Sequence, residues 1–345
     1  MKYEIGMYGG SFDPLHLGHI SDIIRAASQC DVLYIVVCWC SVRDYVRLED
    51  RLSWIKDVTS HLCNVRILTL EDTAPDKTSY NSEIYWKEGA KEIKRMIGRK
   101  IDAVYCGSDY LDTNRFESLY SPESEIIYFD RDEVPICSTD IRTWATDHWD
   151  YIPRIERSRF CRRVLIAGTE SCGKSVLAQN LSLAYNTLFV PEIGRETCER
   201  AGGEENMVLA DFMENLERQY AETEEAAAMA NRLLFVDTDA LTTQFYAERL
   251  LSDQEEKKKC VEEAQRINKL NKWDLVLFLR PDNDFVQDGL RSDIVAANRM
   301  KYHDMLKGLY KKSGIMIHEI GGDYLNIFNT AKKLIESELK ITTDF

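Results

Sequence analysis

The chain has 345 residues, of which 44% are hydrophobic, and a formal net charge of −14 at pH 7. This length accommodates two domains that each bury a core, and the acidic charge argues against a general nucleic-acid surface but not against nucleotide substrates. No segment has the roughly 18 apolar residues that a membrane helix needs, and the N-terminus lacks the apolar core of a signal peptide. The ten cysteines show no Cys-x-x-Cys spacing, so we expect reduced thiols in a cytoplasmic protein that binds neither DNA nor a membrane.

A Gly-rich bend follows the first predicted strand, Tyr3–Tyr8, and leads into a helix predicted over Leu17–Cys30. The bend reads Gly-Gly-Ser-Phe-Asp-Pro-Leu-His-Leu-Gly-His over residues 9–19, which places His16 and His19 on one face of a helix start beside free backbone N–H groups. Two histidines at this spacing could also be a metal pair or part of an ordinary turn. The longer pattern, however, matches the nucleotidyltransferase signature Gly-(Ser/Thr)-Phe-x-Pro-x-His-x-Gly-His.

The rest of the first half alternates strands and helices, which predicts a Rossmann-like parallel sheet with helices on both faces. The further predicted strands are Val32–Val37, Val65–Leu70, Ala103–Cys106 and Glu125–Phe129. The further predicted helices are Arg51–His61, Ser82–Ile97 and Thr139–Thr146. Since ligands bind beyond the carboxyl ends of such strands, we expect residues 9–19, 39–44 and 107–109 to meet at one edge.

The segment Ile136–Arg142 begins the last predicted helix of this half, with Ser138 or Thr139 as its N-cap and Arg142 one turn further on. By itself it predicts only a capped helix. After a sheet that starts with His-x-Gly-His, it resembles the Ser-Thr-x-x-Arg element of nucleotidyltransferases. The resemblance implies that the helix start and Arg142 hold the β- and γ-phosphates of ATP.

The second half begins with a phosphate-binding loop. The loop, Gly-Thr-Glu-Ser-Cys-Gly-Lys-Ser over residues 168–175, follows the apolar run Val164–Ala167 and precedes a helix predicted over Val176–Tyr185, as a Walker A motif requires. Cys172 could be a reactive thiolate or a variable loop position. A basic stretch before the loop is a linker or connecting helix, and we predict domains over residues 1–156 and 161–340.

The remaining second-half elements predict a parallel-sheet, three-layer P-loop kinase domain. The predicted strands are Thr187–Val190, Leu233–Asp239, Leu275–Leu279 and Ile315–Glu319, and the predicted helices are Met207–Arg232, Ile294–Lys312 and Tyr324–Leu339. We expect Lys174 to cradle the β- and γ-phosphates and Ser175 to coordinate Mg²⁺ with Asp237. Asp237, Glu192 and Asp239 are candidate bases for a substrate hydroxyl. Arg291, in a polar segment, is a candidate lid arginine.

A nucleotidyltransferase followed by a P-loop kinase resembles the NadR-type bifunctional enzymes, which join a nicotinamide-nucleotide adenylyltransferase to a ribosylnicotinamide kinase. The resemblance covers nearly the whole chain. Beyond the motifs above, it rests on Trp-Asp-Tyr-Ile-Pro (149–153), Gly-Arg-Glu (194–196), Val-Asp-Thr-Asp-Ala-Leu-Thr-Thr-Gln (236–244) and Asp-Gly-Leu-Arg-Ser (288–292). It implies that ATP phosphorylates nicotinamide riboside to the mononucleotide (NMN), which a second ATP adenylates to NAD. It also implies a Mg²⁺-dependent protein that forms homo-oligomers.

The resemblance also implies site residues. In the transferase they are Gly9, Gly10, Ser11, Phe12, Asp13, His16, His19, Arg43, Arg51, Trp86, Gly107, Ser108, Asp109, Ser138, Thr139 and Arg142. In the kinase, ATP is expected on Gly168, Thr169, Glu170, Ser171, Cys172, Gly173, Lys174, Ser175 and Arg291, and the riboside on Glu192, Arg195, Phe212 and Asp239. Catalysis is assigned to His16, His19, Arg142, Lys174, Asp237 and Glu192, and metal binding to Ser175 and Asp237.

Two departures from the family pattern affect these expectations. Some relatives carry an N-terminal helix-turn-helix, whereas the transferase strand here begins almost at Met1, so we expect that module to be absent. Some relatives have Trp-Glu-Tyr-Gly-Arg-Glu where this chain has Pro191-Glu192-Ile193-Gly194-Arg195-Glu196. The aromatic partner of the nicotinamide ring is therefore missing on that side, and Phe212 is a candidate for the other face.

Two alternatives remain open. One is a fused phosphopantetheine adenylyltransferase and dephospho-coenzyme A kinase, although that transferase usually has Thr where this chain has His16. The other is an NMN adenylyltransferase joined to a P-loop domain of altered specificity, or one that senses NAD. The sequence does not decide the oligomeric state, the acceptance of nicotinate mononucleotide or feedback by NAD.

Overall fold

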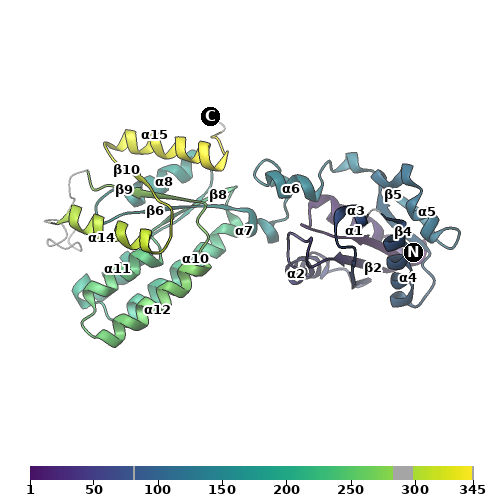
Figure 1. Ribbon diagram of the computed structural model, residues 1–345, viewed down its shortest axis with the longest axis horizontal. Helices are drawn as coiled ribbons and strands as arrows, with labels where there is room; N and C mark the ends of the chain where they lie inside the picture. Colours follow the sequence, from purple (N-terminus) through teal and green to yellow (C-terminus); the bar gives the residue numbers. More distant parts are fainter. Residues whose placement is uncertain (81, 283–297, 344–345) are drawn as a thin grey trace. The chain divides into compact units, whose positions relative to one another are not determined.

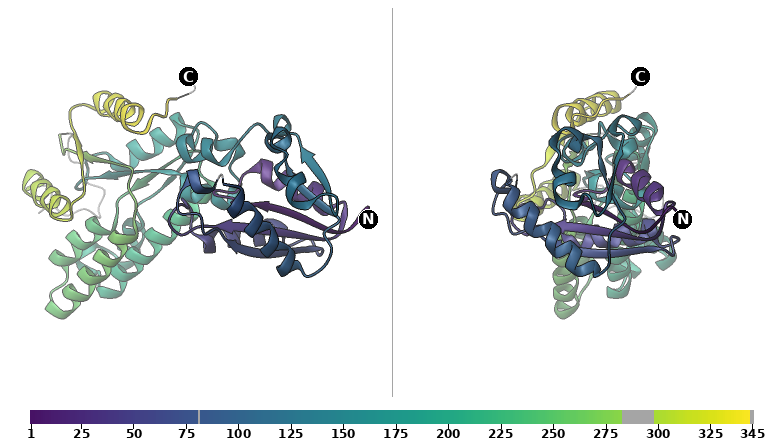
Figure 2. Two further views of the ribbon diagram at one scale, coloured as in Figure 1. Left: turned by 45° about the vertical axis from the view of Figure 1, so that its right-hand side comes forward. Right: turned by 90° about the vertical axis from the view of Figure 1, so that its right-hand side faces the viewer.

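The computed structural model describes residues 1–80, 82–282 and 298–343. The chain divides into two compact units, Met1–Glu156 and Arg157–Phe345. Each unit contains a five-stranded parallel sheet with helices on both faces (Figure 1, Figure 2). The doubly wound α/β architecture predicted for both halves is thus confirmed. Among the described residues, no helix is long and apolar enough to cross a membrane.

The sheet of the first unit has the strand order β3-β2-β1-β4-β5, and every neighbouring pair is parallel. Its strands are β1 (Tyr3–Gly10), β2 (Cys30–Trp39), β3 (Val65–Glu71), β4 (Ala103–Gly107) and β5 (Glu125–Phe129). The order reverses between β1 and β4. A crevice at such a reversal is where doubly wound sheets bind nucleotides, and the Gly-rich bend follows β1 directly.

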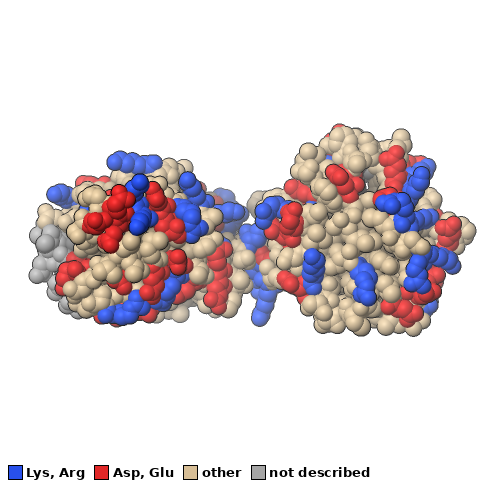
Figure 3. Space-filling model, turned by 90° about the horizontal axis from the view of Figure 1, so that it is seen from below, with Lys and Arg blue, Asp and Glu red and all other residues tan. Residues whose placement is uncertain are grey.

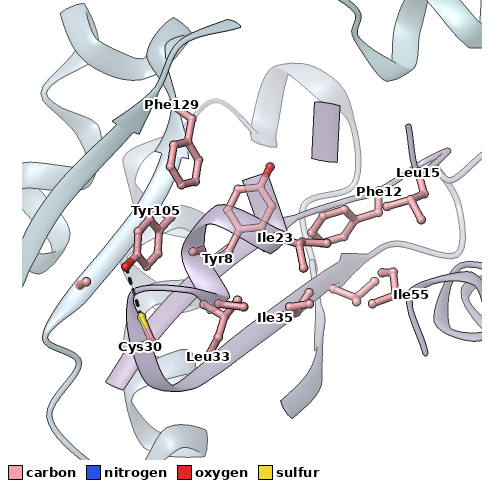
Figure 4. Packing of buried hydrophobic residues seen from close by; sticks show 14 of the residues in the cluster. Tyr8, Phe12, Leu15, Ile23, Cys30, Leu33, Ile35, Ile55, Tyr105 and Phe129 are labelled. Carbon is pink, nitrogen blue, oxygen red and sulfur yellow. Dashed lines mark hydrogen bonds between the residues drawn. The ribbon is translucent and has the colours of Figure 1, made fainter. Parts of the chain in front are cut away.

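Helices cover this sheet in two apolar layers. The helices are α1 (Leu17–Ala27), α2 (Leu48–Thr59), α3 (Lys77–Tyr80), α4 (Glu83–Ile97), α5 (Arg115–Tyr120) and α6 (Ser138–Trp144). Ile23 of α1 and Ile55 of α2 pack in one buried cluster, and Ile93 of α4 packs in the other. Figure 4 shows the first cluster, in which Phe12 and Leu15 of the bend join side chains of the strands. The bend is therefore anchored in the core.

The sheet of the second unit has the order β10-β9-β6-β8-β7, again entirely parallel. Its strands are β6 (Arg162–Ala167), β7 (Leu188–Val190), β8 (Leu233–Asp237), β9 (Leu275–Leu279) and β10 (His318–Ile320). Strand β6 lies at the centre between β9 and β8. The phosphate-binding loop, which follows β6, consequently starts from the middle of the carboxyl edge.

The helices of the second unit are α7 (Arg157–Phe160), α8 (Lys174–Ala184), α9 (Ile193–Ala201), α10 (Leu209–Met229), α11 (Ala240–Leu250), α12 (Gln254–Leu270), α14 (Arg299–Lys312) and α15 (Tyr324–Leu334), which a short π-helix (Ile335–Leu339) continues. Helices α8 and α15 share one buried cluster with the sheet, and α11 and α14 share another. A third cluster joins α10, α11 and α12.

Several parts of the second half differ from the prediction. Helices α9 and α11 were not predicted, and the strand predicted over Ile315–Glu319 forms over His318–Ile320. The strand predicted over Leu233–Asp239 ends at Asp237, because Asp239 is the N-cap of α11. Helix α12 was not predicted, since two of its three buried residues, Cys260 and Ala264, are small and leave only a weak apolar stripe.

Candidate active sites

The two histidines of the first unit lie at the start of α1, just beyond the carboxyl end of β1. His16 is the N-cap of α1, and its Nδ1 accepts a hydrogen bond of 3.3 Å from the backbone N–H of His19. The two rings stack with their centroids 3.6 Å apart, and the Phe12 ring meets His19 edge-on at 4.9 Å. Both histidines are buried, so the bend holds them as a fixed pair.

The surroundings keep both imidazoles neutral. Burial, reinforced by the nearby Arg131 guanidinium, lowers the pKa of His16 to about 3. Burial, His16 and Arg131 together lower the pKa of His19 well below its usual value. A bound polyphosphate would act in the opposite direction, because a nearby negative charge favours the protonated imidazole. The pair is therefore suited to donate hydrogen bonds to an anion.

Gly18 sits between these histidines for a steric reason. A Cβ atom at this position would lie 3.0 Å from Nδ1 of His16 and 3.1 Å from its Cε1. Such contacts are shorter than an ordinary van der Waals approach, so a side chain here would displace the His16 ring.

The predicted phosphate-binding element at α6 lies directly against the bend. The hydroxyl of Ser138 donates a hydrogen bond of 2.9 Å to the carbonyl of Pro14, and Arg142 donates to the carbonyl of Asp13. A second guanidinium nitrogen of Arg142 donates to Thr139 Oγ1 at 2.8 Å. The N-cap prediction was wrong, because Cys137 occupies that position. Its backbone N–H donates to the side chain of Asp140, so the cap depends on Asp140 rather than on a hydroxyl.

Asp13 and Arg51 are turned toward the protein rather than toward solvent. The carboxylate of Asp13 accepts hydrogen bonds from the backbone N–H groups of Tyr45 and Val46, at 2.9 and 2.7 Å. Arg51 is fully buried, donates to the carbonyl of Ser11 at 2.7 Å and forms an ion pair with Asp44. The structure thus places Arg51 beneath the bend, where it supports Ser11, instead of at a surface that a nucleotide could reach.

Arg43 and Trp86 are also engaged with neighbouring side chains. Arg43 forms an ion pair with Asp72. The Trp86 ring contacts Phe116 edge-on, and the Arg115 guanidinium lies 4.5 Å above it. Trp86 is nevertheless half-buried rather than enclosed.

The predicted segment at the end of β4 reveals an arginine that the sequence analysis missed. Arg131, just after β5, pairs through Nε with Asp109 at 2.9 Å, and its backbone N–H donates to Ser108 Oγ at 3.1 Å. A Cβ on Gly107 would lie 2.4 Å from Nε of Arg131, so the guanidinium rests on this glycine. Because Arg131 also depresses the pKa values of both histidines, its charge acts on the same edge of the sheet. The signal that the sequence offered for Arg131 was its position shortly after the predicted strand Glu125–Phe129.

In the second unit, the phosphate-binding loop has the backbone that close approach to a phosphate requires. Gly168 and Gly173 have φ values of +143° and +91°, a region that favours glycine. Lys174 starts α8, and its Nζ donates to the carbonyl of Thr169 at 3.1 Å. Cys172 is buried beneath the loop, and burial raises the pKa of its thiol. Both observations speak against the reactive-thiolate alternative for Cys172.

Ser175 and Asp237 meet as the Walker motifs require. The hydroxyl of Ser175 donates to Asp237 Oδ2 at 2.5 Å, and Thr238 Oγ1 donates to Oδ1 at 3.1 Å. Hydroxyl and carboxylate oxygens suit Mg²⁺. No cluster of three His, Cys, Asp or Glu side chains that could hold a metal occurs in the described part of the chain. The pair fits an ion that takes its other oxygens from phosphate groups and water.

A cavity of about 260 Å³ opens beside this loop. Its lining includes the predicted riboside contacts Glu192, Arg195 and Phe212. It also includes Thr238, Thr242 and Thr243 of the 236–244 motif, and residues that the sequence analysis did not single out, namely Cys198, Glu204, Met207, Asn215, Gln219, Tyr246 and Leu250. Most of these come from α9, α10 and α11, so only the fold brings them beside the loop.

Asp239 is not among the residues that line the cavity. Its carboxylate accepts hydrogen bonds from the backbone N–H and hydroxyl of Thr242, at 3.1 and 3.3 Å, and from the hydroxyl of Tyr310. It is buried, and burial raises its pKa. The structure therefore makes Asp239 the cap of α11, while its buried Oδ2 has no hydrogen-bond partner among the described residues.

Arg291 lies outside the described residues. The structure instead brings Arg299, at the start of α14, to the loop, where its guanidinium donates to the carbonyl of Ser171 at 3.1 Å. This arginine was missed because it lay inside a predicted helix without a motif of its own.

Comparisons with known proteins give a family match for each of the two units. A cytidylyltransferase-like family model matches residues 7–144, and an AAA domain model matches residues 163–326. The trifunctional NAD biosynthesis/regulator protein NadR of Escherichia coli (strain K12) is 28% identical over 327 residues, which span 91% of this chain and 78% of that protein. A phosphopantetheine adenylyltransferase of Streptococcus pneumoniae (strain CGSP14) is 32% identical over 130 residues, 37% of this chain and 74% of that protein. The likeness to NadR thus extends over both units, whereas the second likeness covers little more than one third of the chain.

Solved structures agree with this fold. A crystal structure of NadR protein in complex with NR matches with a TM-score of 0.82 and 22% identity, over 100% of this chain and 98% of that chain. A crystal structure of NadR protein in complex with NAD and AMP-PNP matches with a TM-score of 0.81, over 99% and 98% of the two chains. At this identity the likeness establishes the order and fold of the two units.

Proposed function

We infer that this chain, which belongs to the NadR-type family, carries out two consecutive steps of NAD biosynthesis. The kinase unit phosphorylates nicotinamide riboside with ATP, and the transferase unit adenylates the resulting NMN to NAD with release of pyrophosphate. The observation that carries this inference is the presence, in one chain related to NadR over 91% of its length, of two phosphate-binding centres. One is the pair His16 and His19, and the other is the loop with Lys174.

The transferase centre is suited to a substitution at the α-phosphorus of ATP. An oxygen of the NMN phosphate forms a bond to this phosphorus, the bond to the bridging oxygen breaks, and pyrophosphate leaves. The NMN phosphate is already ionised, so positioning and charge stabilisation suffice. His16 and His19 hydrogen-bond the α- and β-phosphates. Arg142 and Arg131 stabilise the charge on the departing pyrophosphate.

The kinase centre is suited to transfer of a γ-phosphoryl group to the 5′-hydroxyl of the riboside. Lys174 and the loop N–H groups hold the β- and γ-phosphates, while Ser175 and Asp237 are the residues that would hold Mg²⁺. When bound, Mg²⁺ supplies neutralisation of phosphate charge. Glu192 lines the cavity and is the candidate base for the hydroxyl proton. These assignments fit a reaction in which the protein mainly positions its substrates.

Two other functions have a specific observation in their favour. Pro191, in place of the aromatic residue of some relatives, favours a P-loop unit of altered specificity or one that senses NAD. The likeness of the first unit to phosphopantetheine adenylyltransferase favours a pantetheine substrate. The position of His16 in the bend speaks against the second, since that enzyme usually has Thr there.

Product analysis with matched variants tests these functions. The purified chain is incubated with ATP, Mg²⁺ and either nicotinamide riboside or NMN, beside the variants Lys174→Ala and His19→Ala. We expect NAD from both substrates with the wild type. Lys174→Ala should give NAD only from NMN, and His19→Ala should convert the riboside to NMN and stop there.

Each other outcome points to one alternative. NAD from NMN alone with the wild type would identify the P-loop unit as a sensor or as a kinase for another substrate. No nicotinamide product from either substrate would contradict the NadR-type function, and phosphopantetheine would be tried next.

A cytoplasmic location fits the ten cysteines, all of which are free thiols.

A further inference from the structure

One buried side chain of α10 binds the backbone on both sides of Glu192, the candidate base of the kinase. Gln219 is only 8% exposed and lines the cavity. Its side-chain Oε1 accepts a hydrogen bond of 3.0 Å from the backbone N–H of Ile193, and its Nε2 donates to the carbonyl of Pro191 at 3.2 Å. The two ends of a single amide therefore hold the backbone immediately before and after Glu192.

The same amide connects this segment to the strand that ends in Asp237, the carboxylate expected to hold Mg²⁺. Nε2 of Gln219 also lies 3.5 Å from the backbone carbonyl of Asp237, the last residue of β8. Strand β7, which ends at Val190, is the parallel neighbour of β8. Gln219 thus spans the carboxyl ends of two adjacent strands, and it constrains how far apart the backbones of Glu192 and Asp237 lie.

The carboxylate of Glu192 is not used to cap the helix that it precedes. Glu192 is the N-cap residue of α9, yet its side chain makes no capping hydrogen bond there. The N–H of Ile193, one of those that a helix start leaves unpaired, is satisfied by Gln219 instead. A Cβ atom on Gly194 would lie 3.6 Å from Oε1 of Glu192 and 3.5 Å from Nδ2 of Asn215, and all three residues line the cavity. The carboxylate is therefore placed at the cavity wall.

Docking of the two helices does not by itself explain the buried amide. Helices α9 and α10 are joined at the surface by the ion pair of Arg218 with Glu196 at 2.9 Å, and both contribute to one apolar cluster. Figure 3 shows how commonly acidic and basic side chains lie beside one another on one face of the molecule. Burying an amide, by contrast, costs free energy unless its polar atoms are hydrogen-bonded. The backbone groups that Gln219 holds account for its presence at this position.

We propose that Gln219 is a positioning residue, which holds Glu192 where its carboxylate accepts the proton of the riboside 5′-hydroxyl. The proposal rests on the kinase function and the candidate base inferred above. As the hydroxyl oxygen bonds to the γ-phosphorus of ATP, the bond from this phosphorus to the bridging oxygen breaks, ADP leaves, and the hydroxyl proton passes to Glu192. A base must lie within hydrogen-bond reach of the proton that it accepts, and a displacement of about 1 Å can lower a rate roughly a hundredfold.

A double-mutant cycle tests whether Gln219 acts through Glu192. The full chain is supplied with ATP, Mg²⁺ and nicotinamide riboside, and the single-turnover rate of phosphorylation is measured for wild type, Gln219→Met, Glu192→Gln and the double variant. Methionine has a similar length but cannot hold the backbone groups. We expect Gln219→Met to lower the rate about tenfold to a hundredfold, with KM for ATP close to the wild-type value, and Glu192→Gln to lower it about a hundredfold or more. In the Glu192→Gln background, Gln219→Met should have almost no further effect, because the base that it positions is already absent.

Controls separate positioning from a loss of folding. Thr223→Val removes another buried polar group of α10, a hydroxyl that donates to the backbone carbonyl of Gln219 at 2.6 Å and lies outside the cavity lining, and it should keep the wild-type rate. Calorimetric melting shows whether the second unit of each variant is folded. If Gln219→Met does not fold, Gln219→Glu replaces it in the cycle, since it keeps an acceptor for the N–H of Ile193 and loses the donor to Pro191.

The outcomes distinguish the proposal from the function on which it rests. An equal loss of rate in both backgrounds would overturn the proposal, because Gln219 would then act independently of Glu192. An unchanged rate in either single variant would overturn it as well. Failure of the wild type to phosphorylate the riboside would instead contradict the kinase function itself.

Discussion

Replacing Glu170 with glutamine should stabilise the second unit at alkaline pH. Burial, and to a lesser extent the nearby carboxylates of Glu204 and Glu192, raise the pKa of Glu170 from 4.5 to about 7. A group with a raised pKa binds its proton more tightly in the folded than in the unfolded chain, so it stabilises the fold at low pH. This stability is lost as the pH rises from about 4.5 through about 7. Glutamine does not ionise, so the substitution removes this pH dependence.

The size of the effect follows from the shift of the pKa. Each unit of pKa corresponds to about 1.4 kcal/mol, so the ionised Glu170 destabilises the fold by up to about 3 kcal/mol at pH 8. For a domain of this size, such a difference moves the melting temperature by several degrees. At pH 5 the carboxyl group of Glu170 is almost fully protonated in the folded chain, and the two proteins should differ much less.

Calorimetric melting of the ligand-free chain is the appropriate assay, because two units can give two transitions. Wild type and Glu170→Gln are compared at pH 5 and pH 8, with Glu225→Gln as the control for loss of a surface charge. We expect a higher second-unit melting temperature for Glu170→Gln at pH 8 and nearly equal values at pH 5. A constant difference between the two proteins at both pH values would refute the reasoning, since it would show that Glu170 does not titrate between them.

Two further outcomes are expected. Gly18→Ala should lower the transferase kcat about tenfold or more, measured as NAD formation from NMN, because its Cβ would displace the His16 ring; an unchanged rate would contradict the fixed geometry. Arg131→Met should lower transferase kcat/KM by about tenfold to a hundredfold while riboside phosphorylation stays normal, and equal loss of both activities would indicate misfolding instead.

The sequence predicted the parts of the site that are local along the chain. The bend with His16 and His19 joins one strand to the helix that follows it, and the phosphate-binding loop does the same. In both, spacing and the position of glycines determine the backbone. Even the contact between Ser175 and Asp237, 62 residues apart, was predictable because both motifs end neighbouring strands of the sheet.

The sequence did not predict which polar side chains of distant segments bond to one another. Arg51 has the charge of a phosphate ligand, but the fold turns it inward to Ser11 and Asp44. Asp239 has the chemistry of a base, but Tyr310, 71 residues further on, completes its role as a helix cap. In each case the motif gave the residue type correctly, and the partner that decides its role lies on another element. A single sequence carries no signal for such pairs.

Each centre contains a buried ionisable side chain with a shifted pKa, His16 in the first unit and Glu170 in the second. The two shifts have opposite directions, and each lowers the stability of the ligand-free chain over part of the pH range. His16 is buried as a neutral ring beside Arg131, so its low pKa makes the first unit less stable as the pH falls below about 6.5. Glu170 is buried among carboxylates, so its high pKa makes the second unit less stable as the pH rises. A bound polyphosphate would relieve the first arrangement, because a nearby negative charge favours the protonated imidazole. Without ligands, the two units are therefore expected to lose stability at opposite ends of the pH range.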